Sequence, residues 1–116
     1  MRSLLILGLA LAPFAAGATN EKPVTPTSPK TTFYTTKSMD EYSLCLLKAL
    51  NQDYPKSSVE AIKRGKQISV IDGERTSAVA VVSDLDDRSG AMVVIHVESD
   101  VQIERYPAVK LAKNCR

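Results

Sequence analysis

The stretch Thr76–Glu98 reads TSAVAVVSDLDDRSGAMVVIHVE, and it decides the fold class. It holds two apolar, β-branched runs, at 78–82 and 92–95, which belong to expected strands at 76–83 and 91–98 on either side of a polar loop at 84–90. Runs of this composition favour β-strands. The connection is short, so the two strands must pair in an antiparallel manner. Both runs are apolar on both faces, and we expect them to lie in the interior of a sheet.

Two further strands are predicted immediately before this pair. Residues 59–63 and 67–71 are short β-type runs, and Arg64-Gly65 is a plausible turn between them. Asp72-Gly73 is a strong hairpin signal that leads into the strand at 76–83. The segment as a whole therefore predicts a four-stranded antiparallel sheet.

The clearest helix signal lies before the sheet. Ser38 followed by Glu41 forms a capping box, and Pro55 ends the helix because the residue before a proline leaves the α region. Apolar side chains recur on one face of this helix, at Tyr42, Cys45, Leu46, Ala49 and Leu50. Cys45 is therefore expected to face the core.

A shorter helix is predicted near residue 116. Pro107 suits a first helical turn, and the side chains that follow on one face are Ala108, Leu111, Ala112 and Cys115. Residues 101–104 alternate in polarity and favour an additional edge strand. The complete pattern predicts a small single α+β domain: an N-terminal helix, a four-stranded antiparallel sheet and a short C-terminal helix, with both helices on one face.

The first residues have the features of a signal peptide. A short basic start precedes an apolar run from Leu4 to Phe14, and small residues follow up to Ala18. Residues 1–18 are therefore expected to be a cleavable signal peptide, with an uncleaved anchor as the alternative. A membrane-spanning helix needs roughly 20 apolar residues, so no stable span is expected after cleavage. We expect export, to a periplasmic or extracellular location.

Export determines how the two cysteines are interpreted. Cys45 and Cys115 both lie beyond the expected cleavage site, and an even number of cysteines in an oxidising compartment predicts one disulfide. The alternatives are two free thiols or a metal pair, but zinc sites use about four ligands and His96 is the only histidine. If both helices cover the same sheet face, the two sulfurs can meet.

The region between the signal and the first helix is rich in threonine and proline. Residues 19–37 are expected to form a tether, with a possible short strand at 32–36. Residues 38–116 are then the disulfide-linked α+β domain.

No catalytic residue, cofactor site or metal ligand is assigned from the sequence. Counted from Asp84, the fifth, sixth and twelfth positions of a calcium loop hold Arg88, Ser89 and Ile95, which do not fit an EF-hand. No G-x-S-x-G nucleophile motif accompanies His96. The formal net charge is only +2, which argues against nucleic-acid binding.

The apolar strands predict a candidate interaction surface instead. Two helices can cover one face of a sheet, which leaves Met92, Val94 and His96 on the other face. Their neighbours on the preceding strand are either Val79 and Val81 or Ala78, Ala80 and Val82. We expect this surface to bind an unknown protein, a small apolar ligand or a second copy of the chain. The alternative is that the tether or its short strand covers it.

These observations favour an exported, small, non-enzymatic binding or accessory protein of unknown specificity, held by one disulfide. One alternative is a small secreted hydrolase with an unrecognised site. Another is an inhibitor or effector that presents the loop at 84–90.

Overall fold

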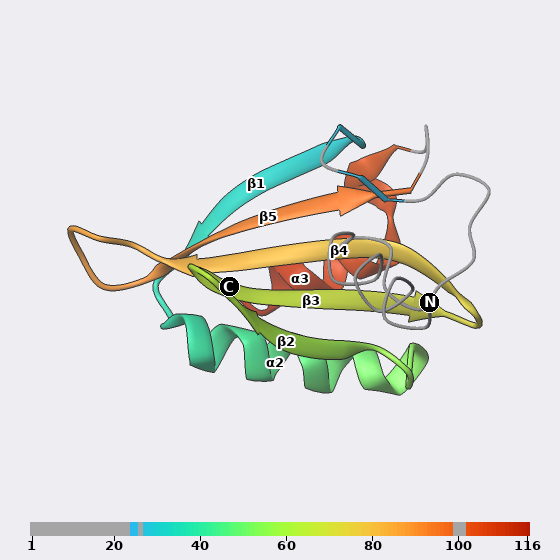
Figure 1. The fold of residues 1–116 in the computed structure, drawn as a ribbon, viewed down its shortest axis with the longest axis horizontal. Helices are drawn as coiled ribbons and strands as arrows, with labels where there is room; N and C mark the ends of the chain where they lie inside the picture. The colour runs from blue at the N-terminus through green and yellow to red at the C-terminus, as the bar shows by residue number, and fades with distance from the viewer. Residues whose placement is uncertain (1–23, 26, 99–101) are drawn as a thin grey trace, which may run out of the picture.

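The computed structural model describes residues 24–25, 27–98 and 102–116 of the chain. Figure 1 shows the arrangement of its helices and strands. The predicted signal peptide at 1–18, residues 19–23 of the predicted tether and Val101 of the predicted edge strand lie outside the described residues. No helix in the described ranges is long and apolar enough to cross a membrane.

The described part of the chain forms one five-stranded sheet, in which every neighbouring pair is antiparallel. The spatial order is β1-β5-β4-β3-β2. In chain order the strands are β1 (Lys30–Thr35), β2 (Ser58–Ile62), β3 (Gly65–Asp72), β4 (Arg75–Asp84) and β5 (Ala91–Val97). The interior positions of β4 and β5 confirm the prediction from their two apolar faces.

The sheet has five strands and not the expected four, because β1 is added to it. A short strand was predicted at 32–36, and the strand runs instead over Lys30–Thr35 and joins the same sheet beside β5. Its Phe33 is paired with Val93 and is buried. Without β1, the apolar strand β5 would form an open sheet edge, which is a template for aggregation. Strand β1 therefore belongs to the domain and is not part of a free tether.

Helix α2 (Met39–Asp53) begins at the predicted capping box. The Glu41 N–H donates to Ser38 Oγ at 3.2 Å, and the Ser38 N–H donates to Glu41 Oε1 at 3.4 Å. The helix ends before Tyr54, next to Pro55, as the sequence predicts. Its buried side chains are Tyr42, Ser43, Leu46 and Leu50.

The segment after β5 differs from the predicted edge strand. Ile103–Arg105 forms the 3-10 turn η2, and helix α3 (Pro107–Asn114) follows with Cys115 as its cap. The Tyr106 hydroxyl donates to Glu98 Oε2 at 3.1 Å, and Arg75 pairs with the same carboxylate at 2.7 Å. These contacts fix the turn against the end of the sheet, so Ile103 and Glu104 lie in η2 and not in the expected strand.

Both helices pack on one face of the sheet, as predicted. One cluster of buried side chains unites them with alternate residues of β1, β3, β4 and β5, including Phe33, Ile68, Ala80, Val93 and Ile95. In Figure 1 the sheet lies in front of α3, and α2 runs along the β2 side. The opposite face of the sheet carries no helix among the described residues.

Candidate functional site

Met92 and Val94 of β5 lie on the face of the sheet opposite α2 and α3, and both are half-buried. Met92 is paired with Tyr34 of β1 and Ser83 of β4. Val94 is paired with Thr32 of β1 and Val81 of β4. Side chains that are directly paired across strands lie on the same face. The predicted surface thus continues over neighbouring strands.

The register decides between the two sets of β4 neighbours that the sequence left open. Val79 is paired with His96, and Val81 is paired with Val94, so these valines share the face of Met92. Ala78, Ala80 and Val82 project to the other face, where each is buried in the core beneath the helices.

His96 lies on the same face as Met92 and Val94, but only 7% of it is exposed. Its Nδ1 is 3.3 Å from the carbonyl oxygen of Ser28, which belongs to the segment before β1. Val79, its partner on β4, is fully buried, and so is Val24. The exposed part of the predicted surface is therefore the half that contains Met92 and Val94.

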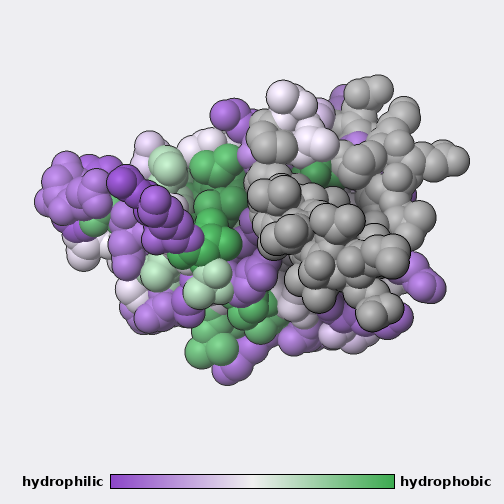
Figure 2. Space-filling model, viewed as in Figure 1, coloured by the Kyte–Doolittle hydropathy of each residue, from purple (hydrophilic) through white to green (hydrophobic). Residues whose placement is uncertain are grey.

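Five apolar side chains make up the accessible part of this face, which we call the open face. They come from four strands, they are half-buried or exposed, and they are Tyr34, Ile62, Val81, Met92 and Val94. Figure 2 shows apolar surface, in green, beside the polar loop at 84–90. Polar Gln67 and Ser83 lie between these residues on β3 and β4.

A shallow cavity of about 670 Å³ adjoins the Met92 end of the open face. It has cationic, anionic and apolar walls, supplied by Met39, Arg64, Ser83, Asp84, Leu85, Asp86 and Met92. The Asp84 carboxylate is already engaged, since its Oδ1 accepts the Met39 N–H at 2.9 Å and so caps α2. The cavity can accept a partly polar group beside the apolar surface.

The loop at 84–90 closes on itself and against β1. The Leu85 N–H donates to the Gly90 carbonyl oxygen at 3.1 Å. Gly90 has φ +112°, and a Cβ there would lie 2.5 Å from the Thr35 oxygen, so only glycine fits. Within the described ranges, no group of three or more His, Cys, Asp or Glu residues is arranged to hold a metal ion.

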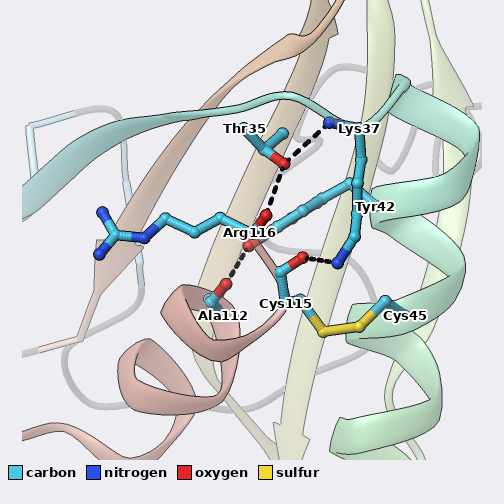
Figure 3. The surroundings of a disulfide bond; sticks show 7 residues. All are labelled: Thr35, Lys37, Tyr42, Cys45, Ala112, Cys115 and Arg116. Carbon is cyan, nitrogen blue, oxygen red and sulfur yellow. Dashed lines mark hydrogen bonds between the residues drawn. A yellow bond between two sulfur atoms is a disulfide. The ribbon is translucent and has the colours of Figure 1, made fainter.

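The disulfide joins Cys45 of α2 to Cys115 at the end of α3, with the Cα atoms 5.9 Å apart (Figure 3). Three hydrogen bonds hold the last residues in the same place. Tyr42 Oη donates to the Ala112 oxygen at 2.6 Å, Thr35 Oγ1 donates to the Arg116 oxygen at 3.3 Å, and Lys37 Nζ donates to the Cys115 oxygen. The predicted disulfide thus links both helices behind the open face.

The shifted pKa values belong to structural contacts away from the open face. Burial raises the pKa of Tyr42, and the nearby Arg116 charge lowers it by a smaller amount. The hydrogen bond from Lys113 lowers the pKa of Glu104. Burial also raises the pKa of Tyr106, whose hydroxyl contacts Glu98 and Ser77. These groups stabilise the fold around η2 and α3.

Sequence reasoning found Met92 and Val94 but missed Tyr34 and Ile62 as parts of the same surface. Tyr34 lay in the predicted short strand, but the sequence did not indicate its partner strand. Ile62 belongs to the far edge of the sheet, and only the register of four strand pairs places it on this face.

Comparison with known proteins identifies no relative of this chain: no family model, no curated protein and no solved structure matches it.

Proposed function

We propose that this chain is an exported, small, non-enzymatic binding or accessory protein that contacts a partner protein through its open face. The observation that carries the proposal is the group of accessible apolar side chains on the side of the sheet opposite α2 and α3. Apolar side chains grouped on an accessible surface are a feature of protein contact sites.

The construction of the domain supports a contact function. Three of the strands that carry the open face, β1, β4 and β5, contribute their other face to one common core, so this part of the surface has a fixed shape before binding. A preformed surface loses little conformational freedom on association. The disulfide is consistent with export, since disulfides persist in oxidising compartments. The partner we expect presents an apolar patch with a polar group that enters the adjoining cavity.

A second candidate, an inhibitor or effector that presents the loop at 84–90, is favoured by one observation. Leu85 and Asp86 of that loop line the cavity beside Met92. The loop and the open face can therefore contribute to the same contact, and substitutions distinguish their contributions.

The test is affinity capture from the native extracellular or envelope fraction, with three forms of the full chain as bait. The Met92→Ser/Val94→Ser variant removes apolar surface from the open face. The matched control is Leu44→Ser, because Leu44 is 56% exposed on α2 and lies outside the open face.

We expect the wild type and the control to retain the same protein, and the double variant to lose it. Sedimentation at several concentrations determines whether that protein is a second copy of the chain. Equal retention by all three baits, or no retained protein, would overturn the proposal.

A further inference from the structure

The two edges of the sheet differ in how they are protected. The β1 edge follows Pro29 and begins with Lys30, and η2 packs against it. Thr31 Oγ1 donates to Glu104 Oε2 at 3.3 Å, which ties this edge to η2. Proline, lysine and covering segments are the usual means of preventing strand addition. The β1 edge is therefore a poor site for a further strand.

The β2 edge also has Pro55, Lys56 and Lys63 beside it, but they lie outside the strand, and no described segment pairs with its outer side. In the described part of the chain, β2 pairs with β3 alone. Four of its five residues are exposed, and the strand contains no proline. Its one charged side chain, Glu60, accepts a hydrogen bond from Gln67 Nε2 at 3.4 Å. This edge presents main-chain groups to any strand that can approach it.

The register identifies which main-chain groups are available. Ile62 is paired with Gly65 across the two-residue turn, so these two residues form the hydrogen-bonded pair that closes the hairpin. The pattern alternates along an antiparallel strand. Val59 and Ala61 therefore direct their N–H and C=O groups away from β3. The same alternation on β3 directs the N–H of Ile71 toward the β2 side, where it donates to Ser57 Oγ at 3.0 Å.

Positive charge flanks the open edge. Lys56 lies before β2, and Lys63 and Arg64 form the turn after it; all three are exposed. None of the three belongs to an ion pair among the described residues. Lys66 is different, because Asp40 pairs with it at 2.8 Å. The edge thus has cationic groups at both ends that remain free to interact.

We infer that the β2 edge is a docking site for an acidic, extended peptide segment of a partner protein. The segment adds a sixth strand by hydrogen bonding to Val59 and Ala61. Acidic side chains near its ends contact Lys56 at one end and Lys63 or Arg64 at the other. The chemistry of recognition is therefore a β-strand backbone with a carboxylate at each end.

A second copy of the chain fits this edge poorly. Two-fold antiparallel pairing that places Val59 opposite Ala61 also places Glu60 opposite Glu60. The same register brings Lys56 opposite Arg64. Like charges directly across strands are destabilising. The charge pattern therefore disfavours self-association in this register, whereas the cationic groups at both ends of the edge attract an acidic segment.

The inference goes beyond the proposed function, because the hydrogen-bonding edge differs from the apolar open face. The two sites adjoin at Ile62. They are separated experimentally by substitutions that affect one and spare the other: Ala61→Pro removes a donor at the edge, and Met92→Ser/Val94→Ser removes apolar surface from the open face.

The test is an NMR titration of the ¹⁵N-labelled full chain with a synthetic peptide in which valine and threonine alternate between terminal glutamates. We expect shifts concentrated on 56–64 and slower exchange of the Val59 and Ala61 amide protons. Replacement of the terminal glutamates by lysines is expected to weaken binding about tenfold, since two favourable surface contacts become repulsive.

Two controls isolate the main-chain contacts. Ala61→Pro is expected to abolish binding, while Ala61→Ser, which keeps the N–H, retains it. If the proline variant does not fold, N-methylation of the peptide amides that face β2 removes the same hydrogen bonds while the protein remains wild type. Absence of binding, equal binding of the N-methylated peptide, or a free protein that is already dimeric through β2 would overturn the inference.

Discussion

Removal of the disulfide should lower the stability of this domain by a predictable amount. The change is the double substitution Cys45→Ala/Cys115→Ala. Alanine is preferable to serine because Cys115 is only 3% exposed, and a hydroxyl there would be buried without an assured partner.

The magnitude follows from the length of the closed loop. The two cysteines are separated by 70 positions. In the chain-entropy model, closing a loop of this size destabilises the unfolded state by about 4 kcal/mol at 25 °C. Small domains have net stabilities of roughly 5–15 kcal/mol. The double variant should therefore lose a large fraction of its free energy of unfolding.

The assay is equilibrium urea denaturation, monitored by circular dichroism, of the wild type with its disulfide intact and of the double variant. The midpoint should fall sharply in the variant. The dependence on urea should steepen, because an unfolded chain without the cross-link exposes more surface. Hydrogen bonds near the cross-link, such as that from Tyr42 to the Ala112 oxygen, should persist in the folded variant. A loss below about 1 kcal/mol would refute the reasoning, because it would mean that the cross-link does not constrain the unfolded chain as the loop model requires.

Three further predictions concern other parts of the structure. Tyr42→Phe should cost about 1 kcal/mol at neutral pH through the lost hydrogen bond to Ala112. Because the pKa of Tyr42 is raised on folding, its contribution to stability should be constant below the ordinary pKa of 10.0 and should fall above it by up to about 1.4 kcal/mol per pH unit. The variant should lose this contribution, and equal alkaline slopes of the two proteins in urea titrations would contradict the assignment. Gly65→Ala should destabilise the domain by about 1–3 kcal/mol in thermal unfolding, since its Cβ would overlap the Val82 carbonyl oxygen, and an unchanged Tm would argue against that close approach. Intact-mass analysis of the native product should show cleavage after Ala18 and no alkylatable thiol, whereas a retained Met1 would contradict export.

Local signals in the sequence were sufficient to predict the elements whose formation depends on neighbouring residues. The capping box at Ser38 and Glu41 defined the start of α2, and Pro107 defined the start of α3. The apolar runs at 78–82 and 92–95 correctly predicted the inner strands β4 and β5. These patterns determine burial and hydrogen bonding within a few residues, so they can be read without knowledge of the tertiary structure.

The features that depend on pairing across the sheet were harder to predict. The β1 strand was recognised only as a possible short strand, because its place beside β5 rests on partners more than fifty positions away. The same limitation left the β4 neighbours of Met92 undecided. The burial of His96 depends on the segment that contains Ser28, which composition alone described as a tether. The turn at η2 replaced an expected strand because tertiary contacts of Tyr106 outweighed local alternation.

Site-specific photocrosslinking in the native compartment tests most directly whether the open face is the contact surface. The crosslinker p-benzoylphenylalanine replaces Val81 on the open face or, as a control, the exposed Lys110 of α3. We expect one discrete adduct from position 81 and none of the same mass from position 110. Equal adducts from both positions, or none from position 81 in a chain that folds normally, would contradict this expectation.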